Sequence, residues 1–307
     1  MDGLEDLPVK KLRIIVSLPN DNAYQHEQGE VAKAAAKRLG LDLDVIRAND
    51  DSITQSQQLL NIIQDRAENR PAAFLVEPVT ATGLRRVAEA AVAAGIAWVI
   101  SNSDVDYVLQ LRKNPLIPVF TVTQGQHPIG QLQGKQLAAL LPQGGSVLFV
   151  EGPSMSSVAV QRREGMESVI SKDIKTTRIR SKWSEESAFQ SASTWLKLAT
   201  SRAEKFDLVA GQTHELAVGA RRALHGVSNP EQQRGWQKLP YIGIGILSQV
   251  KPLVDRRVLA AGVITSVTTD LALTQLVNAM KSKIQPPERC IVEVSSYPEL
   301  EKLETDR

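Results

Sequence analysis

The sequence predicts an α/β protein made of two doubly wound parallel sheets, and three observations support that fold class. Short apolar runs alternate with helical patterns along almost the whole chain. Strands separated by helices of this length pair in parallel through right-handed crossovers, because the connection must pack across a face of the sheet. The alternation resumes after a loop at 102–117, and 307 residues are enough for two cores. We therefore expect two lobes of similar construction.

The elements of the first lobe follow from hydrophobic spacing and from helix start and stop signals. The second helix is predicted to open with the capping box Ser52-x-x-Gln55, and the third to stop at Gly95. One face of the second helix carries apolar residues at core-facing spacing: Leu59, Leu60, Ile63 and Ala67. The expected strands are 12–17, 43–46, 72–76 and 96–100, with a first helix over 23–39 that closes at Gly40.

The second lobe repeats the same pattern. The stretch 226–238, with Asn229-Pro230 and several glutamines, is interpreted as an extended surface loop. Trp98 and Trp195 lie in apolar patterns, so both are expected in the core. The expected strands are 119–122, 146–150, 176–179, 207–210, 241–244 and 259–264, and the expected helices are 126–141, 156–171, 185–200, 214–225 and 270–283.

Composition excludes several classes of protein. Lys plus Arg total 36 and Asp plus Glu total 34, so a formal charge of +2 gives no basic field for nucleic acid. The single cysteine allows neither an intrachain disulfide nor a thiolate zinc cluster. No run approaches the roughly 18 apolar residues of a membrane helix. The acidic start lacks the features of a secretory signal, so a cytoplasmic location is expected as written, or a periplasmic one if a signal peptide was removed.

Familiar catalytic and cofactor motifs are incomplete. The glycines of 243–248 lack the third glycine of a dinucleotide fingerprint, and no phosphate-binding P-loop is present. The segment 152–156 has Ser156 where a nucleophile elbow needs glycine. His214 begins a zinc-helix pattern, but Val218 stands where the second histidine is needed. We expect no enzyme activity, no cofactor and no metal site.

Polar residues follow the first strand at its carboxyl end. Asn22, Tyr24 and Gln25 come directly after the apolar run 12–17 and begin the helix that follows. In open α/β sheets small ligands bind at this edge, beyond the carboxyl ends of the strands. The first crossover therefore predicts a binding site for a small molecule rather than catalytic machinery.

Segments along nearly the whole chain match the pattern of a known family, namely 14–18, 22–24, 74–78, 94–96, Gly130-x-x-x-Gly134, 162–165, Trp183, 212–215 and 219–224. The chain is similar to the type I periplasmic binding proteins, within them to the sugar-binding group typified by ribose-binding protein, and to the effector domains of LacI-type repressors. The resemblance implies one lobe of 1–124 plus 266–290, another of 125–265 plus 291–307, and a three-crossing hinge near 123–125, 265–268 and 290–294.

The same resemblance implies a ligand cleft between the lobes. Tyr24 and Trp183 match the family's aromatic platforms, which suit the apolar faces of sugar rings. Several charged contacts of the family are replaced here, one of them by Gly245, and Val160 stands where the family has arginine. We therefore expect a sugar, polyol or sugar derivative. The residues expected to bind it are Asn22, Tyr24, Gln25, Glu77, Asn102, Ser103, Gln124, Arg162, Trp183, Thr213, His214 and Gly245.

Structural roles are the alternative for some of these residues. Tyr24 and Trp183 could simply cover lobe edges, and Glu77 before a proline could be a helix-initiating anion.

Two functions stay open from the sequence. The first is a monomeric solute-binding protein that closes around a small polar ligand and is read by an ABC permease or a membrane sensor. The second is a cytoplasmic sensing or regulatory domain without a transport role. A LacI-type repressor needs a helix-turn-helix module of roughly 50 residues ahead of Lys11, and the short acidic start leaves no room for it.

Overall fold

Residues 11–198 and 205–305 are described by a computed structural model. The chain divides into two units: unit 1 is Met1–Thr123 with Val267–Cys290, and unit 2 is Gln124–Ser266 with Ile291–Arg307. The chain therefore passes three times from one unit to the other. Within the described ranges, no helix is both long and apolar enough to cross a membrane.

Unit 1 is built on a six-stranded sheet with the order β11-β5-β4-β3-β1-β2. The pairs β1/β2, β1/β3, β3/β4 and β4/β5 are parallel. Its strands are β1 (Arg13–Leu18), β2 (Asp42–Arg47), β3 (Ala73–Val76), β4 (Ala97–Ser101), β5 (Val119–Thr123) and β11 (Arg289–Ile291). Its helices are α1 (Ala23–Leu39), α2 (Ser52–Gln64), the 3-10 turn η1 (Ala67–Asn69), α3 (Arg85–Ala93), α4 (Val108–Leu111) and α12 (Thr269–Ser282).

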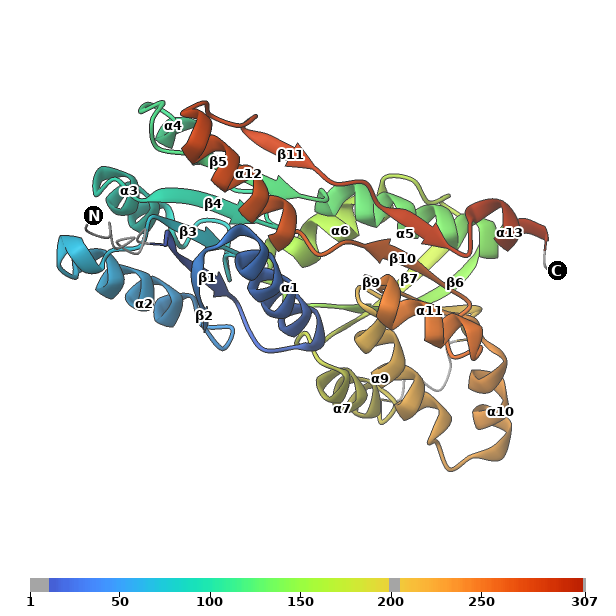
Figure 1. The fold of residues 1–307 in the computed structure, drawn as a ribbon. Helices are drawn as coiled ribbons and strands as arrows, with labels where there is room; N and C mark the ends of the chain where they lie inside the picture. The colour runs from blue at the N-terminus through green and yellow to red at the C-terminus, as the bar shows by residue number, and fades with distance from the viewer. Residues whose placement is uncertain (1–10, 199–204, 306–307) are drawn as a thin grey trace, which may run out of the picture. The chain divides into compact units, whose positions relative to one another are not determined.

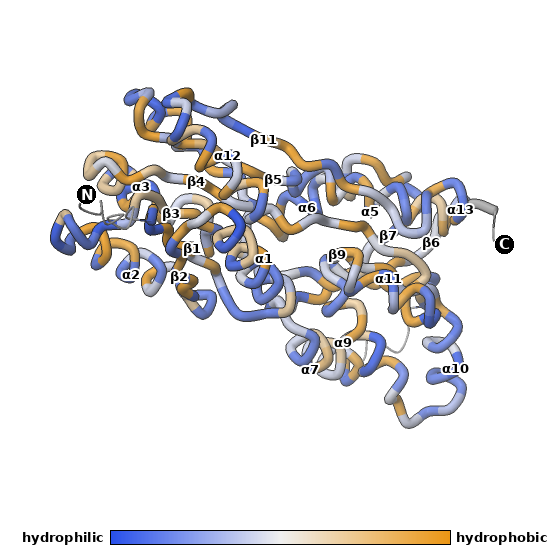
Figure 2. Tube along the Cα trace, in the orientation of Figure 1, coloured by the Kyte–Doolittle hydropathy of each residue, from blue (hydrophilic) through white to orange (hydrophobic). Residues whose placement is uncertain are grey.

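Helices cover both faces of this sheet (Figure 1). On one face α2, α3 and α4 enclose a core that contains Phe74 and Trp98, which meet edge to face with ring centroids 5.8 Å apart. On the other face α1 packs beside α12, a helix that returns from far along the chain. The central strands β1, β3, β4 and β5 are buried along almost their whole length, as expected for parallel strands covered on both faces, whereas the edge strands β2 and β11 are more exposed. Figure 2 shows the hydropathy of each residue along the chain.

Unit 2 repeats the design with a sheet of order β12-β10-β9-β8-β6-β7. Its neighbouring strands are parallel except β10 and β12, which pair antiparallel. The strands are β6 (Gly145–Glu151), β7 (Ile174–Arg180), β8 (Leu208–Gly211), β9 (Tyr241–Ile246), β10 (Ala261–Thr265) and β12 (Ser295–Tyr297). The helices are α5 (Gln126–Leu140), α6 (Ser157–Glu167), α7 (Glu185–Trp195), α9 (His214–His225), α10 (Pro230–Lys238), α11 (Leu247–Asp255) and α13 (Leu300–Thr305).

The two larger apolar clusters of the unit lie between this sheet and its helices. One lies under α5, α6 and α13, and it includes Phe149 and Leu303. The other lies under α7, α9, α10 and α11, where Trp195, Phe206 and Trp236 form an aromatic group. Trp195 and the fully buried Trp98 are thus both core residues, as predicted.

The predicted fold class is confirmed, while several local predictions were wrong. Helix α2 is capped by Asp51, whose carboxylate accepts a hydrogen bond from Ile53 N at 2.8 Å, so Ser52-x-x-Gln55 is not its capping box. The stretch 226–238 is not a loop, because Asn229 caps α10 and Pro230 occupies its first turn. Helix α11, the short α4 within 102–117 and the antiparallel edge strand β12 were not predicted.

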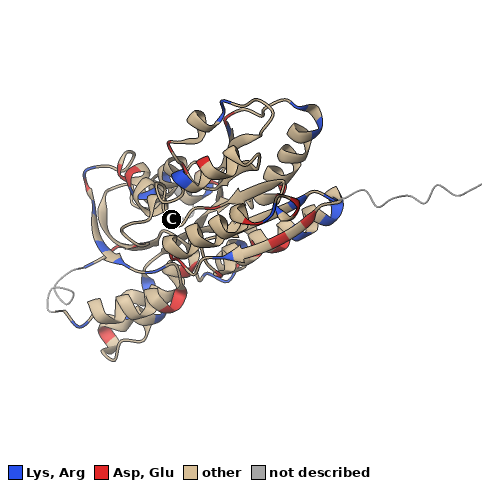
Figure 3. Ribbon diagram, turned by 90° about the vertical axis from the view of Figure 1, so that its left-hand side faces the viewer, with Lys and Arg blue, Asp and Glu red and all other residues tan. Residues whose placement is uncertain are grey.

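Positions with charged residues of both signs are interspersed along the described part of the chain (Figure 3). Lys and Arg positions are therefore not confined to one segment of the ribbon.

Candidate functional site

The carboxyl edge of the unit 1 sheet begins with the turn between β1 and α1. Asn22 caps α1, because its side-chain oxygen accepts a hydrogen bond from Gln25 N at 2.9 Å. Tyr24 is half-buried, and its hydroxyl accepts a hydrogen bond from Gln28 Nε2 at 2.8 Å. The first-turn residues predicted to bind ligand therefore lie at this edge with their positions held by neighbouring amides.

Gln25 and Glu77 meet at this edge from two different strand ends. Gln25 Nε2 donates to Glu77 Oε1 at 2.8 Å, and the two residues are 4% and 6% exposed. The Glu77 loop is fixed by Gln55, which donates to Glu77 O and accepts from Val79 N, each at 2.9 Å. The nitrogen of the Gln25 amide must face the carboxylate, so its oxygen faces away. Among the described residues Gln25 Oε1 has no hydrogen-bond partner.

Asn102 and Ser103 follow β4 at the same edge. Asn102 has a left-handed backbone conformation, with φ of 57°, which asparagine tolerates better than most residues. Both residues are buried, and Ser103 Oγ has no hydrogen-bond partner within the described part of the chain. A buried hydroxyl without a partner is uncommon and calls for a physical explanation such as a ligand or water.

In unit 2, Trp183 lies against the end of β6. A β carbon at Gly152 would overlap Cη2, Cζ2 and Cζ3 of the Trp183 indole, so the ring packs directly on the glycine backbone. Trp183 also contacts the apolar cluster beneath α7 and α9 and remains partly exposed. Glycine at position 152 thus gives the aromatic ring its place at the carboxyl edge.

Arg162 connects the segments of the unit 2 edge. The side chain is 7% exposed, Nε donates to Gln126 Oε1 at 2.9 Å, and Nη1 donates to Gln212 O at 2.7 Å. Gln212 in turn accepts from Gly152 N at 2.9 Å and donates to Ala159 O at 2.7 Å. The prediction of binding residues did not include Gln126 and Gln212. A glutamine directly after an apolar strand, as in Gln212, was the signal that could have indicated one of them.

Thr213 and His214 begin α9 at the end of β8. Thr213 caps the helix through Oγ1, which accepts from Leu216 N at 3.2 Å. His214 Nδ1 lies 3.3 Å from Ile244 O, and burial lowers the pKa of the imidazole below its ordinary value. Because a carbonyl oxygen only accepts, Nδ1 carries the proton of the neutral ring and Nε2 is an acceptor.

Gly245 provides space for the ring of His214. A β carbon at position 245 would stand 2.5 Å from His214 Nδ1. Gly245 has no side chain to offer a ligand, and the position predicted from the resemblance is covered by the imidazole instead. The imidazole of His214 therefore takes up the space that a side chain at position 245 would need, so a glycine at 245 and a histidine at 214 belong together.

Gln124 lies where the chain passes between the units. Its Nε2 donates to Ser266 O at 2.7 Å and its Oε1 accepts from Ser266 N at 2.6 Å. Both amide functions thus join two of the crossing segments, and both residues belong to unit 2. The expected lobe boundaries placed these two residues in the first lobe.

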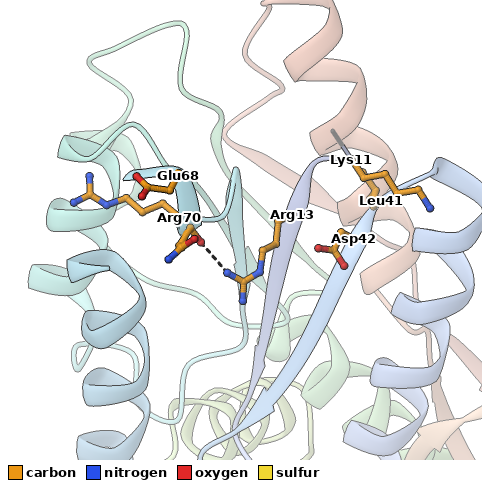
Figure 4. Close-up of a pocket in the computed structure, with 7 residues that line it drawn as sticks. Lys11, Arg13, Leu41, Asp42, Glu68 and Arg70 are labelled. Carbon is orange, nitrogen blue, oxygen red and sulfur yellow. Dashed lines mark hydrogen bonds between the residues drawn. The ribbon is translucent and has the colours of Figure 1, made fainter. Parts of the chain in front are cut away.

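A hollow of about 440 Å³ lies at the opposite, amino-terminal edge of the unit 1 sheet (Figure 4). Arg13 forms part of its wall and donates to Asn69 O at 2.8 Å and to Asp44 Oδ2 at 2.8 Å. Lys11 and Arg70 extend away from each other. The cationic groups do not converge on one point, so this hollow lacks the arrangement of a ligand site, and the carboxyl edges are the better candidates.

Two parallel sheets wound on both faces by helices, with polar groups and rings at their carboxyl edges and three chain crossings, define the type I periplasmic binding protein class. The chain belongs to the family described as the periplasmic binding protein domain, whose profile matches residues 14–286.

Individual relatives agree with this assignment. A xylitol-binding protein of Mycolicibacterium smegmatis is 24% identical over 235 residues, which are 76% of this chain and 61% of the relative. The alignment thus spans less than two thirds of that relative's length.

Solved structures share the fold over nearly the full chain. A solute binding protein of an ABC transporter from Bacillus halodurans C-125, with bound myo-inositol, has 20% identity and a TM-score of 0.78, covering 97% of this chain and 98% of that one. The fructose binding periplasmic domain of a hybrid two component system has 19% identity and a TM-score of 0.77, covering 95% and 93%.

Proposed function

We propose that this protein is a non-enzymatic solute-binding protein that closes around a sugar, polyol or sugar derivative for ABC-type uptake. The observation that carries the proposal is the composition of the two carboxyl edges. Each holds an aromatic ring, Tyr24 or Trp183, fixed beside buried amides and hydroxyls. Aromatic faces stack on sugar rings and polar groups bind hydroxyls, so the pairing suits a polyhydroxylated ligand.

The relatives support the same class of ligand. One relative is called a xylitol-binding protein, and one similar structure contains bound myo-inositol. Both compounds are uncharged and carry several hydroxyl groups. The family name supports a site of action outside the cytoplasm, and we propose that the protein works there as a monomer with a permease as its partner. A sensor role is the second candidate, favoured by the likeness to a periplasmic domain of a two component system. Neighbouring genes for a permease and an ATPase would support uptake, and a neighbouring kinase gene would support sensing.

A thermal-shift screen over sugars and polyols tests the proposal. A ligand present at 100-fold its dissociation constant stabilises the folded protein by about 2.7 kcal/mol, which gives a clear rise in melting temperature. Any hit is then titrated against Tyr24→Ala and Trp183→Ala, which we expect to bind about tenfold or more weakly. The absence of any hit, or unchanged affinity in both variants, would contradict the proposal.

A further inference from the structure

Two buried polar groups at the carboxyl edges have their hydrogen-bond direction set by the protein. In Gln25 the amide nitrogen donates to Glu77 Oε1, so the oxygen is the atom left over, and it has no partner among the described residues. In His214 the protonated Nδ1 faces Ile244 O, so Nε2 has a lone pair. Reversing the Gln25 amide, or moving the His214 proton to Nε2, would place two acceptors face to face.

Both groups therefore present acceptors, and neither can turn round to donate. A hydroxyl of a ligand satisfies such an acceptor because it can donate, whereas a carboxylate or phosphate oxygen only accepts. Buried acceptors that face another acceptor remain unpaired, and that costs binding free energy.

The predicted site includes one acidic and one basic side chain, and both form hydrogen bonds within the protein. Glu77 brings negative charge next to Gln25. Arg162, the only arginine or lysine among the predicted binding residues, donates through Nε and Nη1 to oxygens of the protein itself. At the start of α9 the Thr213 hydroxyl already caps the helix, and Glu215 supplies negative charge in its first turn.

Resting on the proposed function, we infer that Gln25 and His214 are specificity-determining residues that select neutral, hydroxyl-donating polyols and sugars against their acidic derivatives. The discrimination acts through hydrogen-bond polarity, so it applies to carboxylates and phosphate esters of the same carbon skeleton. It goes beyond the class of ligand already proposed, because it states which derivatives are rejected and by which residues.

Matched ligand pairs test the inference by calorimetry on the full chain. The probes are xylitol and D-xylonate, myo-inositol and myo-inositol 1-phosphate, and D-galactose and D-galacturonate. For any pair that binds, the neutral member should bind about 100-fold more tightly than the acid. Equal or tighter binding of the acid would overturn the selectivity and leave the proposed binding function standing, whereas no binding by any member would contradict both.

Variants then assign the selectivity to the two residues. His214→Phe keeps a ring over Gly245 and removes the acceptor, and Gln25→Met keeps the length of the side chain and removes the amide. Each should weaken binding of the neutral ligand by about tenfold and reduce its advantage over the acid. His214→Gln should recover part of the affinity, because its amide can donate to Ile244 O and still present an oxygen.

Controls separate this role from a structural one. His225→Phe changes a histidine at the other end of α9, and Gln58→Met removes an amide on α2 that donates to Arg47 O. Both should bind as the unmodified protein does. A purely structural effect of His214→Phe or Gln25→Met would lower the affinity for both members of a pair equally, and an unchanged ratio would overturn the assignment.

Discussion

At the strand ends, the side-chain amides of buried glutamines form hydrogen bonds with backbone groups, as a neighbouring strand would. Gln55 bonds to Glu77 O and Val79 N, and Gln124 bonds to the backbone N and O of Ser266. Gln212 bonds to Gly152 N and Ala159 O. An amide carries one acceptor and a donor group in fixed geometry, so it can pair with backbone that no neighbouring strand reaches. The loops that carry the predicted site are held in this way.

Gly152 is predicted to control the position of Trp183. Gly152→Ala would force the indole to move, because the added methyl overlaps the ring. We expect about a tenfold loss of affinity for whichever sugar or polyol the screen identifies, and a loss of about 1–3 kcal/mol in the free energy of unfolding. Calorimetry and urea denaturation measure the two effects. Gly235→Ala is the control, since apart from the chain neighbours and the backbone of its own helix no atom lies within 4 Å of the added carbon, and equal behaviour of the two variants would contradict the packing argument.

His214 is also predicted to make stability depend on pH. Burial lowers its pKa in the folded state, and the pKa of His225 is lowered by burial and by Arg221. In the unfolded chain both histidines titrate near about 6.5. Below that pH the unfolded state binds protons that the folded state does not, so the free energy of unfolding falls as pH falls.

Urea denaturation between about pH 7.5 and 5.5 measures this slope before most carboxylates titrate. We expect His214→Phe to reduce the slope and His214→Phe with His225→Phe to reduce it further. A slope that is unchanged in the double variant would assign the pH dependence to other groups.

At the scale of elements, α12 depends on a side chain of α1. Gln28 Oε1 accepts from Thr268 N and Thr269 N, each at 3.2 Å, at the start of α12, and Gln28 Nε2 donates to Tyr24 OH at 2.8 Å. One amide thus holds the end of a helix about 240 residues away and the aromatic ring of the predicted site.

Gln28→Met should therefore leave buried backbone N–H groups without acceptors. We expect the free energy of unfolding to fall by about 1–3 kcal/mol, together with weaker ligand binding through Tyr24. Gln110→Met, which removes an exposed amide bonded to Arg85, should change neither quantity. Full stability of Gln28→Met would show that water replaces the amide at the helix end.

The boundaries of helices were predicted correctly where hydrophobic spacing was regular. The prediction failed where the same residues can begin either a turn or a helix. Helix α9 was predicted at 214–225 and is found at His214–His225. Asn229-Pro230 was interpreted as a turn, yet asparagine as a cap and proline in the first turn also begin helices. The burial of Trp236, which packs on Trp195 and Phe206, decides between the two.

At the scale of the whole molecule, unit 1 is completed by a segment that follows most of unit 2. Leu273 and Leu276 of α12 are fully buried against unit 1, and Val277 is 3% exposed. A fragment of 1–123 would leave the matching apolar surface open to water, which costs roughly 25 cal/mol per Å².

We expect the 1–123 fragment to lack a cooperative urea transition and a near-ultraviolet circular dichroism signal. Joining 1–123 to 267–290 through a short glycine-serine linker should restore both, since the flanking residues Gln124 and Ser266 hydrogen-bond to each other. Cooperative unfolding of 1–123 alone would show that α12 is dispensable for this core.

The alternation of apolar runs and helical patterns was enough to predict parallel sheets, because hydrophobic spacing is a local property of the chain. The polar residues after strand ends were also visible locally, and the binding site that they predict at the carboxyl edges stays a prediction. The hydrogen-bond polarity of the site was not predictable in this way. The amide nitrogen of Gln25 donates to Glu77, which lies 52 residues further along the chain. The Nδ1 nitrogen of His214 faces the carbonyl of Ile244, which lies 30 residues further along. Only the tertiary structure brings these partners together, and with them it decides which atoms remain as hydrogen-bond acceptors.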